Sequence, residues 1–409
     1  MNLIIINIGE IVGIVPEGVL RKQGEEMSET GVLKDAWLRI EDGLIRDFGS
    51  MAECPEDKGE TLDAEGGMVM PAFCDSHTHI VYAGSRDGEF LDKINGLSYE
   101  EIAARGGGIL NSSDLLNSTS EDELYEQSME RVREMMAAGT GAIEIKSGYG
   151  LNPEAEMKML RVIRRIRESV PAVVRATFLG AHAVGRGYTH EGYVDAVIGM
   201  MPEAAELADF VDVFCDEGFF TVEDTERILR AGAACGLPAK IHANELAESG
   251  GVEAGVRFEA LSVDHLERSG RAQIEALRGA PTMPTMLPGS SFFLGIPFAP
   301  AREYISSGLG IALASDFNPG SSPSGDMRFV MALGCIKMRL TPVQAFNAVT
   351  LNSAYAMGVA HLVGSVTPGK IANLIVTRPG WTLTKLPYLY RSPFIKEVLL
   401  GRSRFQRDL

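Results

Sequence analysis

The stretch GMVMPAFCDSHTH, residues 67–79, is an apolar run that ends in two histidines, His77 and His79. Side chains at positions i and i+2 of a strand project from the same side, so these two imidazoles form half of a metal site. The chain has seven histidines. Five of them end short apolar segments that are typical of buried strands, namely His77, His79, His182, His242 and His265. Histidine is therefore concentrated at predicted strand ends.

Strand-like runs alternate with helical segments after residue 67. We predict eight strands, at 68–75, 141–146, 174–181, 211–215, 238–243, 260–265, 280–285 and 310–316. Helix starts lie between them, because Ser120 with Glu123 and Thr341 with Gln344 have the spacing of a capping box. Eight strands with intervening helices are the number that a (β/α)8 barrel requires. The sequence predicts an α/β fold, with a TIM-like barrel over residues 67–361.

The two ends of the chain are rich in β-forming segments. Residues 36–48 place two short apolar runs on either side of Asp42-Gly43, which is a hairpin signal. From about residue 362 the chain returns to this style, with runs at 371–376 and 395–400. We therefore predict one small β-sandwich domain built from residues 1–66 and 362–409.

Composition and charge exclude several classes of protein. A chain with 45% apolar and 23% charged residues is typical of a globular enzyme. The net charge of −17 argues against nucleic acid or an anionic membrane as partner, and no apolar stretch approaches the roughly 18 residues of a membrane span. Residues 1–15 lack the basic region of a signal peptide, and the five cysteines form no CxxC pair. We expect a cytoplasmic protein that acts on a small molecule.

Four side chains at predicted strand ends make a candidate metal site. His77 and His79 end the first strand, His242 ends the fifth, and Asp316 ends the eighth. Three imidazoles and one carboxylate suit a single Zn²⁺ or an iron ion (Fe²⁺ or Fe³⁺), with room for a water whose pKa the metal lowers to about 7. Each residue alone has an ordinary alternative, since Asp316 can cap the following loop. Their common position at strand ends favours the metal.

Longer strings carry a resemblance to a known family. They are DSHTH at 75–79, YAGSR at 82–86, GGGI at 106–109, EIKSGYGL at 144–151, TFLGAHAV at 177–184, KIHANE at 240–245, DHL at 264–266, LPGSSFFLG at 287–295 and SDFNPGSSP at 315–323. With them the sequence resembles the amidohydrolase superfamily and, more narrowly, its imidazolonepropionase family. The resemblance covers nearly the whole chain. It implies hydrolytic opening of the ring of 4-imidazolone-5-propanoate to N-formimidoyl-L-glutamate, a step of histidine degradation.

The resemblance also implies residue roles. Glu245 would take the proton of the attacking water and pass it to the leaving ring nitrogen, and His265 would orient the attacking oxygen and stabilise the oxyanion. The implied substrate contacts are Arg86 for the propanoate, Tyr149, His182, Glu245, Asn318, Gly320 and Ser321. Residues 318–321 also have the composition of a turn, and both descriptions can hold at once.

Two alternatives remain open at this point. A deaminase of a nucleobase-like ring shares the metal-ligand pattern, and a catalytically silent scaffold of the same fold is a remote possibility. Lys146 invites comparison with the bridging lysine of two-metal relatives, but it falls on the second strand, so we interpret it as an ordinary lysine and expect one metal. A symmetric homodimer is the default assembly for such an enzyme.

Overall fold

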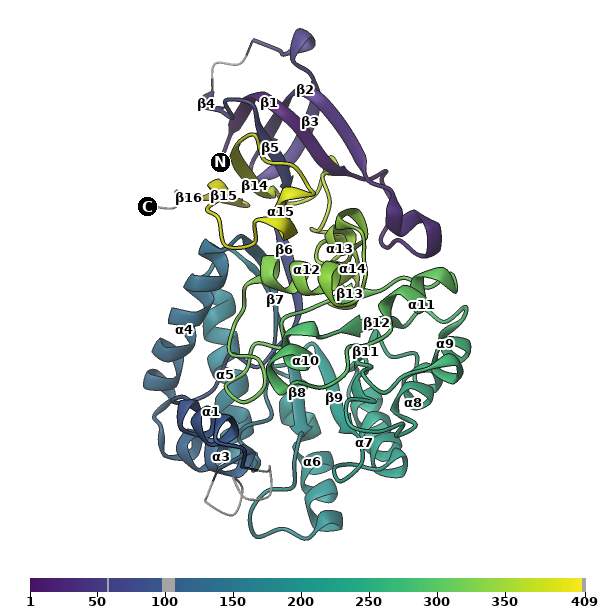
Figure 1. Cartoon of the computed structure of the whole chain (residues 1–409). Helices are drawn as coiled ribbons and strands as arrows, with labels where there is room; N and C mark the ends of the chain where they lie inside the picture. The colour runs from purple at the N-terminus through teal and green to yellow at the C-terminus, as the bar shows by residue number, and fades with distance from the viewer. Residues whose placement is uncertain (57–58, 98–106, 407–409) are drawn as a thin grey trace.

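The computed structural model describes residues 1–56, 59–97 and 107–406 of the chain (Figure 1). Within these residues, eight parallel strands form one sheet in sequence order. The strands are β6 (Phe73–Thr78), β7 (Thr140–Lys146), β8 (Val173–Ala181), β9 (Phe210–Cys215), β10 (Lys240–Ala243), β11 (Ser262–His265), β12 (Met283–Met286) and β13 (Ala312–Leu313). The predicted α/β barrel is confirmed.

Two backbone hydrogen bonds close the barrel between its first strand and the segment after its last strand. Asp316 N donates to His77 O at 3.0 Å, and His79 N donates to Phe317 O at 2.9 Å. The closure therefore lies at the carboxyl end of β6, where the candidate metal ligands stand.

Helices cover the outside of the barrel, as Figure 1 shows. The helices of the described chain are α1 (Asp87–Ile94), α3 (Ile109–Ser118), α4 (Glu121–Ala137), α5 (Pro153–Ser169), α6 (His190–Ala204), α7 (Val222–Ala234), α8 (Gly251–Arg257), α9 (Arg271–Leu277), α10 (Pro288–Leu294), α11 (Ala301–Ser306), α12 (Met327–Ile336), α13 (Pro342–Ala348), α14 (Leu351–Ala356) and α15 (Lys385–Tyr388). Of the 3-10 turns η1 (Gly24–Ser28) and η2 (Met51–Glu53), η2 packs on β1 (Leu3–Ile14) and β2 (Gly31–Glu41) of the sheet at the chain termini and not on the barrel. The predicted caps form, since Ser120 accepts from Glu123 N at α4 and Thr341 forms a capping box with Gln344 at α13. None of the described helices is long and apolar enough to cross a membrane.

The two termini build a second sheet, drawn at the top of Figure 1. Among the described residues it has the strands β1 (Leu3–Ile14), β2 (Gly31–Glu41), β3 (Leu44–Ser50), β4 (Glu60–Asp63), β5 (Gly67–Pro71), β14 (Asn373–Pro379), β15 (Ile395–Leu400) and β16 (Ser403–Gln406). The pairs are antiparallel except where β1 meets β4 and β5. Side chains from both ends of the chain share one apolar core. Asp42 and Gly43, with φ of 53° and 82°, form the predicted hairpin turn.

The predicted strand at 68–75 is in fact two strands. Gly67–Pro71, which the sequence assigns to the barrel, pairs with β1 and β14 in the terminal sheet, and only Phe73–Thr78 enters the barrel. The chain crosses from one sheet to the other at Ala72, whose N–H donates to Asn373 O at 2.9 Å. An uninterrupted apolar run predicts burial but not which sheet provides the partners, and for this reason the break was not visible in the sequence.

The segment between β1 and β2 is tied to the barrel by the buried amide of Asn352. Its oxygen accepts from Lys22 N at 2.8 Å, and its nitrogen donates to Lys22 O and Ile311 O, both at 2.9 Å. The Asn352 side chain thus hydrogen-bonds both the N–H and the C=O of Lys22 and links this residue to the start of β13.

Asn352→Ala removes these bonds and leaves buried backbone groups without partners. A buried group that loses its partner costs about 1–3 kcal/mol, so we expect the free energy of unfolding to fall by about 2–4 kcal/mol. Urea denaturation followed by circular dichroism measures this loss. A change below about 0.5 kcal/mol, the range of surface substitutions, would contradict it.

Candidate functional site

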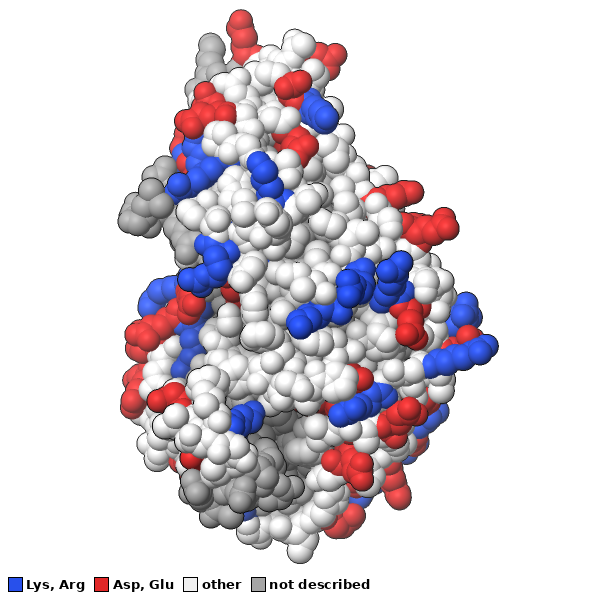
Figure 2. Space-filling view, in the orientation of Figure 1, with Lys and Arg blue, Asp and Glu red and all other residues white. Residues whose placement is uncertain are grey.

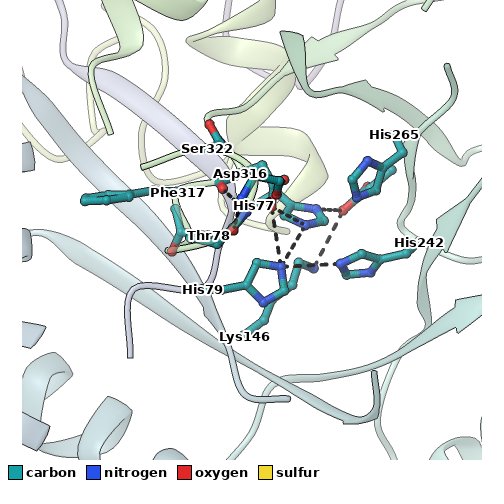
Figure 3. Close-up of polar contacts among 12 residues, drawn as sticks. His77, Thr78, His79, Lys146, His242, His265, Asp316, Phe317 and Ser322 are labelled. Atoms are coloured by element: carbon teal, nitrogen blue, oxygen red, sulfur yellow. Dashed lines mark hydrogen bonds and ion pairs between the residues drawn. The ribbon is translucent and has the colours of Figure 1, made fainter. Parts of the chain in front are cut away.

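Four potential ligand atoms converge at the carboxyl ends of β6, β10 and β13, and Figure 3 shows the side chains pointing toward one another. His79 Nε2 lies 3.2 Å from His77 Nε2 and 3.4 Å from His242 Nε2. Asp316 Oδ1 is 3.6 Å from the Nε2 atoms of both His77 and His79. Ligands at about 2.1 Å from a tetrahedral metal stand about 3.4 Å apart, so these separations fit one zinc or iron ion.

The protonation of the imidazoles suits this use. Burial, together with neighbouring positive groups, lowers the pKa values of His77 and His79 well below the usual value for histidine. Two neutral imidazoles that bring Nε2 atoms within 3.2 Å place lone pairs around one point. A cation at that point would satisfy both.

Two aspartates set the orientation of two of these rings. Asp264 Oδ2 lies 2.6 Å from His77 Nδ1, and Asp212 Oδ2 lies 3.0 Å from His242 Nδ1. A carboxylate on Nδ1 keeps the proton there and leaves the Nε2 lone pair for the metal. The sequence analysis missed both aspartates. The available signal was an acidic residue inside an apolar strand, as in Val211-Asp212-Val213.

Strained backbone turns functional side chains toward the centre. Asp316, His265 and Asn244 have φ of 53°, 84° and 58°, in the left-handed region that costs a residue with a side chain about 1–3 kcal/mol. The turn after Asn244 is held by Asp216, whose carboxylate accepts from Glu245 N at 2.7 Å and from the next two backbone N–H groups. Asp216, also absent from the sequence prediction, therefore positions Glu245.

Glu245 and His265 lie side by side. His265 Nδ1 is 3.6 Å from Glu245 Oε2 and 3.6 Å from Glu267 Oε2, too far for a hydrogen bond. Burial raises the pKa of Glu245 to about 7, although His265 lowers it. Burial lowers the pKa of His265, but Glu245 and Glu267 outweigh that effect and raise it well above the usual value. His265 is thus a buried cation held between two carboxylates.

A cavity of about 460 Å³ opens above this centre. The predicted site residues that line it are His79, Arg86, Tyr149, His182, Glu245, His265, Asp316, Asn318, Gly320 and Ser321. His77 and His242 lie beneath it with the metal-ligand atoms. Phe214 and Phe219, which the sequence analysis did not single out, add an aromatic wall with ring centroids 4.2 Å apart. Of the string GGGI, Gly106 lies outside the described residues.

Arg86 is one of the cationic side chains that line this cavity, with Lys93. Its Nε and Nη2 donate to Glu89 Oε2 at 2.9 and 2.5 Å. A Cβ at Gly320 would collide with Arg86 Nη1, so the guanidinium can occupy this position only because residue 320 has no side chain. Asn318 Oδ1 accepts from Gly320 N and Ser321 N, both at 2.8 Å, which is the turn that the composition predicts.

Tyr149 and His182 also line the cavity, with ring centroids 5.5 Å apart. Glu156 on α5 holds the turn that carries Tyr149 by accepting from Gly148 N at 3.0 Å and from Gly150 N at 2.7 Å. His182 Nδ1 donates to Gly148 O at 3.0 Å, and burial lowers the pKa of His182 to about 3. The ring is therefore neutral, and its Nε2 carries a lone pair that accepts hydrogen bonds.

Charge on the outer surface does not supply the anion site. The chain has a net charge of −17, and Figure 2 shows acidic groups mainly along the edges of this view with a few Lys and Arg across its middle.

Comparisons with known proteins agree with this geometry. A family model described as the amidohydrolase family matches residues 68–398. The chain is 54% identical to an imidazolonepropionase of Flavobacterium johnsoniae, covering 98% of this chain and 99% of the relative, and 50% identical to one of Christiangramia forsetii with the same coverage. The solved structure of E. coli guanine deaminase superposes with a TM-score of 0.77 and covers 100% of both chains. At 13% identity that likeness shows the fold alone.

If His79 and Asp316 ligate a metal, His79→Ala and Asp316→Ala should each lose most of the bound metal. His182→Ala is the matched control, because this ring stacks on His79 with centroids 5.1 Å apart but its Nδ1 bonds to Gly148 O. Elemental analysis of the purified proteins measures the metal. Full metal in His79→Ala, or an equal loss in His182→Ala, would show that the ligand set is wrong.

Proposed function

The chain belongs to the amidohydrolase family and, within it, to the imidazolonepropionases, and from that premise we propose how its residues divide the reaction. It is a metal-dependent hydrolase that opens the ring of 4-imidazolone-5-propanoate with water and gives N-formimidoyl-L-glutamate in histidine degradation. The observation that carries the division of roles is the pair Glu245 and His265 beside the converging ligand atoms, in one cavity with Arg86. No specific observation favours the deaminase or the silent scaffold.

We propose that one divalent metal, zinc or iron, is held by His77, His79, His242 and Asp316. When bound, it lowers the pKa of a water to about 7 and so supplies a nucleophile at neutral pH. The distances of 3.2–3.6 Å from His79 to His77 and His242, and from Asp316 to His77 and His79, support a single ion.

Glu245 is proposed to carry the proton of the reaction. It takes a proton from the attacking water and gives it to the ring nitrogen that leaves when the C–N bond breaks. A raised pKa of about 7 suits both steps, because the group then accepts and releases a proton with little cost near neutral pH. His265, a cation next to it, donates toward the oxyanion that forms at the ring carbonyl.

The substrate ring is proposed to lie beside His182 and against the aromatic wall of Phe214 and Phe219. Because His182 Nδ1 is used by Gly148 O, His182 Nε2 accepts a hydrogen bond from a ring N–H of the substrate. Tyr149 adds a hydroxyl on the same side of the cavity. The turn of Asn318, Gly320 and Ser321 completes the wall next to Arg86.

The propanoate is proposed to bind Arg86. The Arg86 guanidinium forms an ion pair with Glu89, which orients it and partly screens its charge. The substrate carboxylate would bind to this oriented cation as its second carboxylate partner. A planar fork of donors favours a carboxylate over a neutral group.

We also propose a cytoplasmic homodimer. Cys74, Cys215, Cys235 and Cys335 form no disulfide in the described structure, which supports a reducing compartment. The symmetric dimer is the common assembly for enzymes of this kind.

Glu245→Gln keeps the shape of the side chain but cannot accept the proton. Turnover should fall by about 10²–10⁴ while the metal stays bound. Glu267→Gln is the matched control, because Glu267 is also 3.6 Å from His265 but bonds to Ser291 Oγ and lies outside the cavity lining. Its loss should be below about tenfold. Ring opening followed by ultraviolet absorbance measures both, and turnover by Glu245→Gln within a few-fold of the parent would assign the base elsewhere.

Arg86→Ala should lower kcat/KM for imidazolonepropanoate by about tenfold to hundredfold, since a charge-assisted bond contributes about 1.5–3 kcal/mol. Arg86→Lys should recover only part, because a point charge cannot replace the fork. The amide of the substrate has no carboxylate and so gains nothing from Arg86. Arg86→Ala should therefore lower the ratio of kcat/KM for the acid to kcat/KM for the amide. An unchanged ratio of the two kcat/KM values would place the carboxylate site elsewhere.

A further inference from the structure

A buried ammonium lies beneath the metal-ligand residues. Lys146 on β7 is wholly buried, and its Nζ is 2.7 Å from Glu144 Oε1, 2.8 Å from Asp212 Oδ2 and 3.6 Å from Asp264 Oδ2. Figure 3 places it below His79 and His242. The sequence analysis interpreted it as an ordinary lysine, but an ordinary lysine keeps its ammonium in water.

Two of these three carboxylates are the ones that orient the metal-site rings. Asp212 Oδ2 contacts both Lys146 Nζ at 2.8 Å and His242 Nδ1 at 3.0 Å. Asp264 Oδ2 contacts Lys146 Nζ at 3.6 Å and His77 Nδ1 at 2.6 Å. One ammonium on β7 therefore reaches two imidazoles, on β10 and β6, through one aspartate each.

Each aspartate is also fixed on its other oxygen. Asp212 Oδ1 accepts from the backbone N–H of His242 at 3.1 Å, and Asp264 Oδ1 accepts from Ser262 Oγ at 2.5 Å. A carboxylate bonded at both oxygens has one orientation left. Without the cation, the buried carboxylates would lack their compensating charge and would move or recruit water to recover it.

Two effects of the ammonium on a metal oppose each other. Its positive charge repels a nearby cation, which would weaken metal binding. Its hydrogen bond to Asp212 and its ion pair with Asp264 hold the rings in the direction that binds a metal, and loss of such an orienting contact typically weakens metal binding by about 10–100-fold. The direct hydrogen bond to Asp212 at 2.8 Å favours the second effect, because it determines geometry, whereas the repulsion acts through intervening side chains.

We propose that Lys146 is a positioning residue of the metal centre, whose ammonium holds Asp212 and Asp264 together and through them sets the directions of the His242 and His77 rings. The inference rests on the proposed function in one respect, that His77 and His242 ligate the metal.

Lys240 is a matched control. It is also wholly buried, it forms an ion pair with the same Glu144, and it donates to Ala356 O at 3.0 Å and Ser76 O at 3.3 Å. In the described part of the chain its hydrogen bonds reach neither Asp212 nor Asp264. Lys146→Met and Lys240→Met thus both remove a buried ammonium from Glu144, but only the first releases the aspartates.

The experiment uses the full chain, freed of metal by a chelator and then titrated with Zn²⁺ against a competing chelator, and with Co²⁺ to record its d–d absorption bands. Lys146→Met should bind Zn²⁺ about 10–100-fold more weakly and shift the Co²⁺ bands, because the ligand geometry changes. Lys240→Met should keep the parent spectrum and an affinity within about threefold. The thermal unfolding temperature of the metal-free protein should be lower than that of the parent for both variants, because both lose the charge pairing with Glu144.

Equal Zn²⁺ affinities in the two variants, or tighter binding by Lys146→Met, would overturn the proposal and leave Lys146 as a charge partner only. If Lys146→Met does not fold, Lys146→Gln retains a polar side chain and should still bind Zn²⁺ more weakly than the parent; parent-like affinity would overturn the proposal. None of these readouts requires turnover. A parent chain that binds Zn²⁺ but opens no ring would refute the proposed roles in catalysis, whereas unchanged metal binding in Lys146→Met would refute this inference alone.

Discussion

The closure of the barrel between β6 and the segment after β13 is the constraint on which the site depends. The backbone bond from Asp316 N to His77 O is reinforced by Asp75, whose carboxylate accepts from Ser315 N at 3.0 Å and Ser315 Oγ at 2.5 Å. These bonds fix Asp316 against the HxH strand although the two are distant in sequence. Because the ligands belong to the closure itself, the metal-site geometry and the barrel form together.

Beneath the ligands the barrel interior is charged, where most barrels of this type pack branched apolar side chains. Glu144, Lys146, Asp212, Lys240 and Asp264 are all wholly buried. Charges removed from water cost several kcal/mol each unless they are paired, and here every one is paired with another or with an imidazole. The layer does little for net stability, and its evident use is to orient the rings above it.

The cavity combines two environments that require opposite electrostatics. Around Glu245, burial holds a carboxyl near neutrality so that it can move a proton at ordinary pH. At the far wall Arg86 stays charged and oriented beside Gly320. If Glu245 carries the proton and Arg86 binds the substrate tail, as proposed, their separation lets one small site use both, even in a chain of net charge −17.

The sequence by itself determined the α/β barrel class and the strand ends that carry the histidines, because apolar periodicity and residue type are local properties. Other cavity-lining residues, such as Arg86 and Tyr149, were implied only by the resemblance of longer strings to a known family. It did not determine that residues 67–71 pair in the terminal sheet, nor that Asp212, Asp264 and Lys146 form one network. A single charged residue in an apolar strand gives the same local sequence pattern whether its side chain points to a charged partner inside the barrel or to a helix outside it. Only barrel closure, which brings the interior faces of distant strands within bonding distance, decides which charges meet.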